Sequence, residues 1–500
     1  MYIPDIFSFK SHIPPIRLFQ EWNTVMTADK YQIDMCHGPL FGKIVLFSLP
    51  LMFTYILQLL FNAVDLVVIG HYAPHQAMAA VGATMNLNSL IINIFIGISI
   101  GANVLAARYF GAQDAKSMSR TLHTSITVAV VGGIILMFLG LAVAKPLLIL
   151  METPEDILPL SCTYIWICFC AIPFIMLYNF GCSILRAVGD TRRPLYFLII
   201  AGVVNVLLNL FFVIVCGMDV GGVALATAFS HAISALLILR TLLTAKGMCR
   251  LEIRKMAVDF KILKTMLKIG IPAGFQSSSF AISNMIIQSS INAFGSLAIA
   301  GTTAALGLEG IVYVGSYAFH QTAISFVAQN LGGQKFKRIV KSLYGCFFCS
   351  ASSCLIMGLA FYFAGEFLLA IFNPDPQVIA WGMVRMKILF TTYALCGFMD
   401  VASGGLRGLG YSLLAAVISF VGVCAFRVWW VWFVFPRYRS MENLMLSYPL
   451  SWLLAAMISG GLLIWLCRRM IRNHCASRTV AWSKLGPGVP RGFRYLGGPK

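Results

Sequence analysis

Three carboxylates interrupt long apolar stretches of this sequence and are the residues best suited to chemistry. Asp65 lies in PheAsnAlaValAspLeuValValIleGly, Glu309 in LeuGlyLeuGluGlyIleValTyr and Asp400 in GlyPheMetAspValAlaSerGly. A charged carboxylate inside a bilayer is costly, so such a residue is functional, or else it is protonated or paired. Asp65 has no basic residue three or four positions away, so we expect its protonation to respond to its surroundings. For Glu309 and Asp400, a functional role and interhelical hydrogen bonding both remain open.

Uncharged polar side chains in other apolar stretches could complete a site around Asp65. Asn62 precedes Asp65 by about one helical turn, and Asn205 and Asn209 face the same way because they are four residues apart. Such oxygen-rich side chains suit a proton, a water or Na⁺, although each amide could instead simply bond a neighbouring helix. The residues predicted to couple transport to a cation are Asp65, Asn62, Asn179, Asn205, Asn209 and Thr227.

A second polar set lies in the other half of the chain. The residues predicted to line a substrate cavity or a second coupling site are Gln276, Asn284, Gln288, Glu309 and Asp400. Arg427, inside an apolar stretch, would pair with a carboxylate or reach toward an interface. Arg385 and Lys387 would reach toward an interface or mark span edges that are misplaced in the sequence. We expect His231 and His320 to be structural.

The composition excludes an ordinary soluble protein. Of 500 residues, 59% are hydrophobic and only 11% charged, and the mean hydropathy is +0.84. The net charge is +19, but the basic residues lie between apolar stretches and not on a soluble face that could bind nucleic acid. The 14 cysteines are scattered and indicate no disulfide framework; Cys346 and Cys349 have CxxC spacing, but no second ligand pair follows, so we expect no structural metal. The sequence predicts a membrane protein without a cofactor.

Twelve apolar stretches are each long enough to cross a bilayer. They lie at about 44–70, 77–105, 121–144, 158–184, 195–217, 222–243, 265–293, 298–328, 342–365, 378–403, 412–436 and 446–467. We therefore predict an all-α membrane protein of 12 transmembrane helices. Placing the amino terminus in the cytoplasm puts 31 of the 37 Lys and Arg residues on that side, so both termini should be cytoplasmic.

Five segments follow from this pattern. They are a cytoplasmic amino-terminal segment (1–43), a first lobe (44–243), a basic cytoplasmic linker (244–264), a second lobe (265–467) and a basic, disordered tail (468–500).

The two lobes repeat one another at an offset of about 221 residues. LeuArgAlaValGly at 185–189 matches LeuArgGlyLeuGly at 406–410, and AlaArgTyrPheGlyAlaGln at 107–113 matches AlaGlnAsnLeuGlyGlyGln at 328–334. Because each unit has six spans, both copies enter the membrane from the same side, related by a pseudo-two-fold axis along the membrane normal. This duplication is typical of secondary transporters that expose a central cleft alternately to each side.

Together these motifs resemble the multidrug and toxic compound extrusion (MATE) family, on its bacterial DNA-damage-inducible-F-like branch, over about residues 38–467. Further motifs that carry the resemblance are AsnAlaValAsp ending at Asp65, AspThrArgArgPro at 190–194 and AsnValLeuLeuAsn at 205–209. The resemblance implies that Asp65, Asn205 and Thr227 belong to a first-lobe cation site. Asn209 stands where some relatives have a second carboxylate, which favours a proton over Na⁺ at Asp65.

The resemblance implies export of organic cations or amphipathic drugs in exchange for protons or Na⁺, by a monomer in the bacterial cytoplasmic (inner) membrane. Its partners would be small-molecule drugs and membrane lipid. The alternative is a flippase for a lipid-linked oligosaccharide or peptidoglycan precursor, which would need a basic cavity. An enzyme is not expected, because no clustered catalytic set such as HisGluxxHis is present.

Overall fold

The computed structural model of the chain describes residues 31–72, 75–151 and 153–484, and all regular structure in these ranges is helical. The elements of the first half are α2 (Leu40–Tyr72), α3 (His75–Gly111), α4 (Ala115–Leu150), α5 (Leu158–Ala187), α6 (Arg192–Leu210), the π-helix η2 (Phe211–Val215) and α7 (Val220–Thr244). Two short 3₁₀ turns follow, η3 (Gly247–Cys249) and η4 (Ile253–Lys255). The elements of the second half are α8 (Phe260–Asn292), α9 (Ser296–Gly332), α10 (Phe336–Phe363), α11 (Gly365–Phe372), α12 (Pro376–Gly408), α13 (Ser412–Ser419), the π-helix η5 (Phe420–Ala425), α14 (Phe426–Trp429), the π-helix η6 (Trp430–Val434) and α15 (Met441–Lys484).

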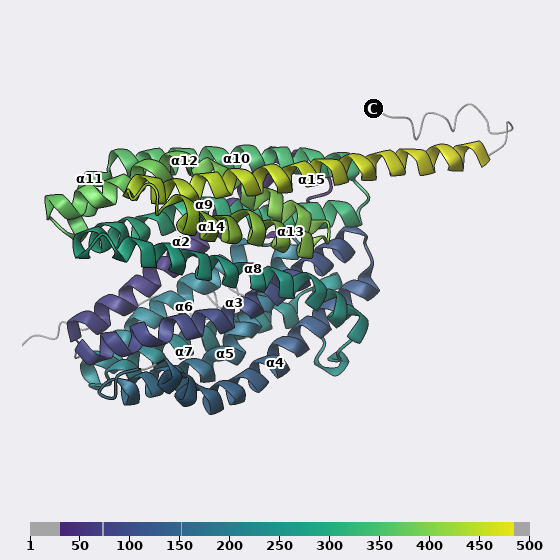
Figure 1. Ribbon diagram of the computed structural model, residues 1–500. Helices are drawn as coiled ribbons and strands as arrows, with labels where there is room; N and C mark the ends of the chain where they lie inside the picture. Colours follow the sequence, from purple (N-terminus) through teal and green to yellow (C-terminus); the bar gives the residue numbers. More distant parts are fainter. Residues whose placement is uncertain (1–30, 73–74, 152, 485–500) are drawn as a thin grey trace, which may run out of the picture.

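The helices are long enough to cross a bilayer, as the sequence predicts. Eleven helical segments of the described residues combine the length and the hydropathy that a span requires. Helix α8 has 33 residues but does not reach that hydropathy, because Gln276, Ser277 to Ser279, Asn284 and Gln288 interrupt it. It nevertheless runs alongside the other long helices (Figure 1).

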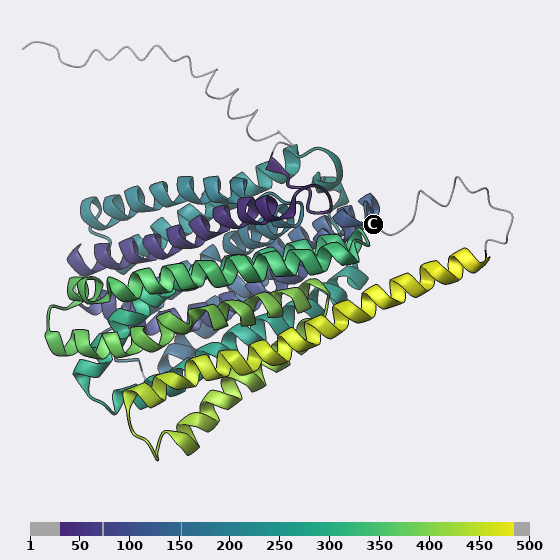
Figure 2. The ribbon, with the colours of Figure 1, turned by 90° about the horizontal axis from the view of Figure 1, so that it is seen from above.

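The two halves form two layers of helices (Figure 1), and Figure 2 shows the long helices running side by side. The internal repeat is visible in the loops as well. Gln113 and Gln334, at matching positions, have φ values of 57° and 55°, and Gly189 and Gly410 have φ values of 94° and 95°. These left-handed residues follow the ends of α3, α9, α5 and α12, where the chain must leave the helix. The same local sequence therefore ends equivalent helices in the same way.

The halves are in close contact at the end of the molecule that carries loops 112–114, 188–191 and 245–259, called here the basic end. Gly97 and Gly101 on α3 face Gly270 and Met266 on α8 so closely that a Cβ at either α3 glycine would overlap the α8 backbone. Small residues four apart let helix backbones approach in this way. Nearby, the Ser325 hydroxyl donates to Asn103 Oδ1 at 3.2 Å, which joins α9 to α3.

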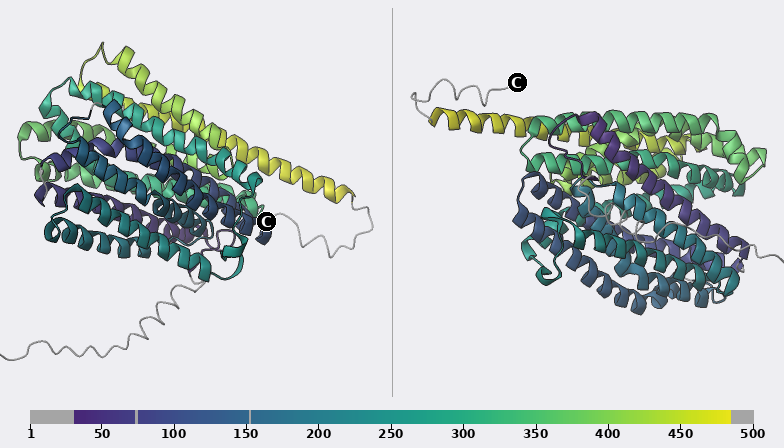
Figure 3. Two further views of the ribbon diagram at one scale, coloured as in Figure 1. Left: turned by 90° about the horizontal axis from the view of Figure 1, so that it is seen from below. Right: turned by 180° about the vertical axis from the view of Figure 1, so that it is seen from behind.

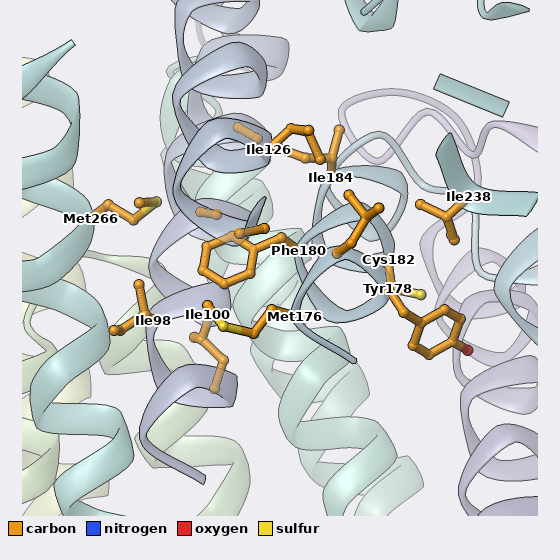
Figure 4. Close-up of a cluster of buried hydrophobic side chains, with 14 of the residues drawn as sticks. Ile98, Ile100, Ile126, Met176, Tyr178, Phe180, Cys182, Ile184, Ile238 and Met266 are labelled. Atoms are coloured by element: carbon orange, nitrogen blue, oxygen red, sulfur yellow. The ribbon is translucent and has the colours of Figure 1, made fainter. Parts of the chain in front are cut away.

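The largest apolar cluster lies within the first half and extends across this seam. In Figure 4 the ring of Phe180 lies among Ile98, Ile100 and Met176, and Met266 reaches toward the cluster from α8. A second cluster, in the other half, packs Phe390, Tyr393 and Trp452 around α12 and α15. These two apolar clusters pack the helices of each half together. Polar side chains of the same helices line two cavities, one in each half.

A short strap, residues 31–39, crosses the basic end between the two halves. Met35 is fully buried, and its backbone N–H donates to Gln329 Oε1 of α9 at 3.0 Å. Arg338 on α10 donates to the carbonyls of Met35, His37 and Gly38 at 2.8, 2.9 and 3.0 Å. On the first-half side, Gly189 contacts Ile33 so closely that a Cβ would overlap its backbone. The strap therefore contacts both halves.

The two chain ends differ from the sequence prediction where they are described. Helix α15 continues to Lys484 and projects from the bundle (Figures 1 and 3), so residues 468–484 are helical where disorder is predicted. Residues 485–500 of the predicted tail, and residues 1–30 of the amino-terminal segment, lie outside the described residues. The linker forms the turns η3 and η4, and Asp259 then caps α8 by accepting from the Lys261 and Ile262 amides.

Candidate functional site

The first half contains a polar cavity of about 210 Å³ around Asp65. Five of the six residues predicted for cation coupling line it. Asn209, the sixth, does not line the cavity but donates a hydrogen bond to Asp65. The other lining residues include Gln58, Tyr178, Ser230, His231 and Ser234. The predicted residues lie on α2, α5, α6 and α7 and are up to 165 positions apart in the sequence, from Asn62 to Thr227. The fold brings them together around one cavity.

Asp65 accepts hydrogen bonds on both carboxylate oxygens. Asn209 Nδ2 donates to Oδ1 at 2.5 Å, and the Thr227 hydroxyl donates to Oδ2 at 3.3 Å. Asn205 supports both donors, because its Oδ1 accepts from Asn209 at 3.2 Å and its Nδ2 donates to Thr227 at 3.3 Å. No basic side chain of a described residue lies within ion-pair distance of Asp65. The acid is therefore held by neutral groups alone.

Local sequence explains how α6 reaches Asp65. Asn205 and Asn209 are one turn apart on the buried face of α6, and the π-helix η2 begins two residues after Asn209. Single π turns inside α-helices are frequent at functional sites. Gly202, one turn before Asn205, lets the Phe61 ring pack directly on the helix, where a Cβ would overlap it. Asn62 and Asn179 also line the cavity, but neither side chain forms a hydrogen bond to Asp65. Asn179 Nδ2 donates to the Ile175 carbonyl at 2.8 Å.

The second half contains a larger cavity of about 420 Å³. It is lined by Asn284, Glu309 and Asp400 of the predicted set, together with Ser277, Tyr313, Tyr393, Arg427, Tyr448 and Trp452. Two predicted lining residues do not line this cavity. Gln276 is buried between Arg407 and Ser419, and Gln288 bonds Asn292 on its own helix.

Glu309 forms a buried ion pair inside the second half. Arg385 Nη2 and Nε donate to Glu309 Oε2 at 2.7 and 3.1 Å, and the Tyr393 hydroxyl donates to Oε1 at 3.4 Å. The expectation that Arg385 reaches toward an interface is wrong, because its side chain is only 4% exposed. Glu309 therefore belongs to a neutral pair, and the two lobes are not bridged by it.

Asp400 is the second buried acid of this cavity, and no basic group of a described residue lies within ion-pair distance of it. The Ser316 hydroxyl donates to its Oδ2 at 2.7 Å, and its backbone carbonyl contacts His320 Nδ1 at 2.7 Å. His320 Nε2 lies 3.3 Å from Arg407 Nη1, and Arg407 Nη2 donates to Gln276. This polar chain explains why His320 is buried.

Arg427 is also buried, and here the sequence left two alternatives, a carboxylate partner or an interface. The structure gives neither. Its Nε and Nη1 donate to Ser451 Oγ and Asn284 Oδ1, both at 3.0 Å, and its guanidinium carbon lies 4.0 Å from the centre of the Tyr448 ring. Hydropathy alone cannot distinguish a buried arginine from one at an interface, so its role was missed.

The two cavities are built at matching positions of the repeat. At offsets of 221 or 222 residues, the lining residues of the first cavity correspond to lining residues of the second: Asn62 to Asn284, Asn179 to Asp400, Asn205 to Arg427, Thr227 to Tyr448 and His231 to Trp452. Applying the same offsets to these first-half residues would have identified Arg427, Tyr448 and Trp452 as cavity residues.

A Na⁺ ion at Asp65 would need several oxygen ligands. The described residues contain no group of three or more His, Cys, Asp or Glu side chains that could hold a metal ion. Asp65, Thr227 and the amide oxygens of Asn205 and Asn209 could supply oxygens, and Asn209 Oδ1 is buried without a hydrogen-bond partner. Asn209 presents its amide nitrogen to Asp65, whereas Asn205 presents its oxygen to Asn209 and its nitrogen to Thr227.

Comparisons with known proteins agree with this architecture. The chain is 27% identical over 394 residues to the probable multidrug resistance protein YpnP of Bacillus subtilis, covering 79% of this chain and 88% of that protein. It is 25% identical to an FAD transporter of Shewanella oneidensis, covering 76% and 84%. An outward-facing multidrug resistance MATE transporter structure superposes with a TM-score of 0.83 at 19% identity, covering 89% and 99%, and shows the same fold. These relatives do not favour the flippase alternative.

The match to the MatE family model identifies the family of this chain. That model matches the chain twice, at residues 50–211 and 272–432, once in each half. The all-helical, membrane-spanning fold predicted from the sequence is confirmed by the same match and by the structural likeness. The chain belongs to the MatE family of multidrug efflux transporters.

Proposed function

We propose that the protein is a secondary active antiporter that exports organic cations or amphipathic drugs in exchange for protons or Na⁺. Membership of a multidrug transporter family and the relatives named for multidrug resistance support this activity. The protein would act as a monomer in the bacterial cytoplasmic membrane, with both termini in the cytoplasm. The basic end would then be the cytoplasmic end, in keeping with the excess of Lys and Arg in its loops.

The observation that carries the proposal is the environment of Asp65. It is an acid inside a span, without a basic partner among the described residues, and it faces a cavity with two hydrogen-bond donors from other helices. Protonation would remove the negative charge that organises Asn209 and Thr227. Because those residues lie on α6 and α7 while Asp65 lies on α2, a change of charge would alter how three helices pack.

Coupling follows if drug and ion prefer different conformations. In the described arrangement the halves touch at the basic end, through α3 with α8 and α9. Rocking apart at this seam would open the basic end, which this proposal places at the cytoplasm. An ion that binds near Asp65 from outside would weaken drug binding in one state, and its release to the cytoplasm would reset the transporter. We favour the proton as the coupling ion, because Asp65 is the only carboxylate among the described residues that line its cavity.

The test is ethidium efflux from cells that lack their main pumps, under an imposed pH or Na⁺ gradient. Wild-type efflux should follow one gradient and therefore name the ion. Asp65→Asn should abolish gradient-driven efflux, since the amide cannot change its charge. Asp156→Asn, at an exposed position between α4 and α5, is the matched control and should behave as wild type. Undiminished efflux by Asp65→Asn at equal expression would refute the assignment.

A further inference from the structure

The second cavity has a chemistry of its own that ion coupling at Asp65 does not use. Its matching positions replace the small polar groups around Asp65 with a guanidinium and large aromatic rings, Arg427 for Asn205, Tyr448 for Thr227 and Trp452 for His231. Its volume, about 420 Å³, is twice that of the first cavity and falls in the range of small-molecule sites.

The charged side chains that line this cavity include one cation, Arg427, and one acid, Asp400, that have no ion-pair partner among the described residues. Glu309 is neutralised by Arg385 at 2.7 Å, so neither residue offers a net charge to a ligand. Arg427, only 4% exposed, has no carboxylate within 4.0 Å among the described residues, and its hydrogen-bond partners Ser451 and Asn284 are neutral. A buried charge without a counter-charge is costly, so an acidic group that entered the cavity would gain the full benefit of pairing with it.

The guanidinium is also oriented for such a group. The Arg427 guanidinium carbon lies over the Tyr448 ring at 4.0 Å from the ring centre, and two of the three guanidinium nitrogens donate to Ser451 and Asn284. The third nitrogen, Nη2, makes no hydrogen bond to a described residue. Arg427 lies on α14, the single α-helical turn between the π-helices η5 and η6, and such irregular helix is common where side chains serve function.

The remaining walls suit an aromatic ring. Tyr313, Tyr393, Tyr448 and Trp452 line the cavity, with Phe280 on α8. Rings of this kind stack on planar ligands and add geometric preference to the burial of apolar surface. Asp400 faces the same cavity, so a ligand that also carries a positive group would find a complementary charge there.

We propose that this cavity is the substrate site, and that Arg427 there binds a carboxylate on an aromatic substrate. The inference deepens the proposed export function and rests on it. It assigns the two lobes different tasks: the acid of the first lobe takes the coupling ion, and the guanidinium of the second lobe selects the substrate. The preferred substrates would be aromatic carboxylates and zwitterions in addition to simple organic cations.

A pair of fluorescent probes tests this assignment directly. Diethylaminocoumarin carboxylate and its carboxamide have nearly the same shape but differ by one negative charge. Their binding to the purified full-length protein in nanodiscs of neutral lipid can be measured by fluorescence anisotropy, with empty nanodiscs subtracted. The wild type should bind the carboxylate about tenfold more tightly, as expected for one charge-assisted hydrogen-bonded pair.

Arg427→Gln should abolish this preference while leaving carboxamide binding unchanged, and retained carboxamide binding shows that the variant is folded. Arg427→Lys keeps the positive charge and should keep part of the preference. This variant provides the test if Arg427→Gln does not fold. Arg439→Gln, at an exposed position outside the cavity, is the control and should match the wild type. Equal binding of the two probes by the wild type, no binding of either, or an unchanged preference in Arg427→Gln would overturn the proposal. Because no ion gradient is present, loss of antiport and loss of the carboxylate preference are separate results.

Discussion

At the scale of single residues, the protein buries charged groups in two distinct ways. Glu309 and Arg385 neutralise one another at 2.7 Å, whereas Asp65, Asp400 and Arg427 are surrounded by neutral partners among the described residues. A neutral pair is a structural arrangement, because its members satisfy one another. An acid or base without a counter-charge remains available to an ion or a ligand, which is why the two proposed tasks fall to Asp65 and Arg427.

The ion pair leads to a stability prediction. Glu309→Gln would leave the Arg385 guanidinium buried without its counter-charge, and we expect a loss of roughly 3–5 kcal/mol. The midpoint of thermal unfolding, followed by size-exclusion chromatography of the detergent-solubilised protein, measures it.

Glu155→Gln, at an exposed loop position, is the control and should leave the midpoint unchanged. Replacing both partners, Glu309→Met with Arg385→Met, should recover part of the loss because no buried charge remains. If Glu309→Gln were as stable as the control, Glu309 and Arg385 would not depend on one another.

At the scale of helices, the halves are held together by close backbone contact and by the strap. The contact depends on glycines of α3 and α8 whose spacing of four places them on one face of each helix. The strap depends on side chains of α9 and α10 that satisfy its backbone. Both features join the halves at the basic end, where an exporter of the proposed mechanism must open and close.

The seam can be tested at Gly101. In Gly101→Val the new side chain would overlap the Met266 carbonyl, so α3 and α8 must separate. Forcing extra atoms into a packed contact costs roughly 1–3 kcal/mol, and the midpoint of thermal unfolding should fall accordingly. Gly82→Val lies on the same helix with nothing near its Cβ and should have a much smaller effect. Equal midpoints for both variants would show that the seam does not depend on this contact.

The strap can be tested at Arg338, which donates to three of its carbonyls. Burial raises the pKa of Asp34 in the strap, but the Cys36 amide and the His37 ring outweigh it and hold the pKa below its ordinary value, so Asp34 stays ionised at neutral pH. Arg338→Gln therefore removes strap contacts without changing that charge. Amide hydrogen exchange of residues 33–39 should become about tenfold faster or more.

Lys337→Gln, exposed on the same helix, is the control and should leave exchange at its wild-type rate. An unchanged rate in Arg338→Gln would mean that the strap is held by Gln329 and by Asn330, whose Nδ2 donates to the Met35 carbonyl at 3.2 Å, and not by the guanidinium.

At the scale of the whole molecule, the sequence predicts the fold well because its signals are local or repeated. Apolar length identifies the spans, and the offset of 221 residues relates the halves. The grouping of Asp65 with Asn205 and Thr227 is also predicted correctly, because α6 presents its amides on one face and the family resemblance relates them to the acid. What these residues do remains a prediction.

Contacts between distant helices are less accessible to sequence reasoning. Nothing near Glu309 indicates that its partner is Arg385, 76 residues away on another helix. Gln288 lies one turn beyond Asn284 on the same face of α8, but it bonds Asn292 and does not line the cavity, and hydropathy does not show where along the helix the cavity ends. The α15 helix extends past Cys467 because basic and polar residues can continue a helix once it leaves the membrane, whereas composition alone suggested disorder.

The most direct measurement of the central claim runs the coupling in reverse. In proteoliposomes with no imposed ion gradient, an ethidium gradient should drive protons, or Na⁺, across the membrane in the opposite direction, because coupling between two ligands is reciprocal. We expect the wild type to build up an ion gradient in this way and Asp65→Asn to build up none. Ethidium that crosses without any ion movement, or equal ion movement in Asp65→Asn, would contradict antiport through this acid.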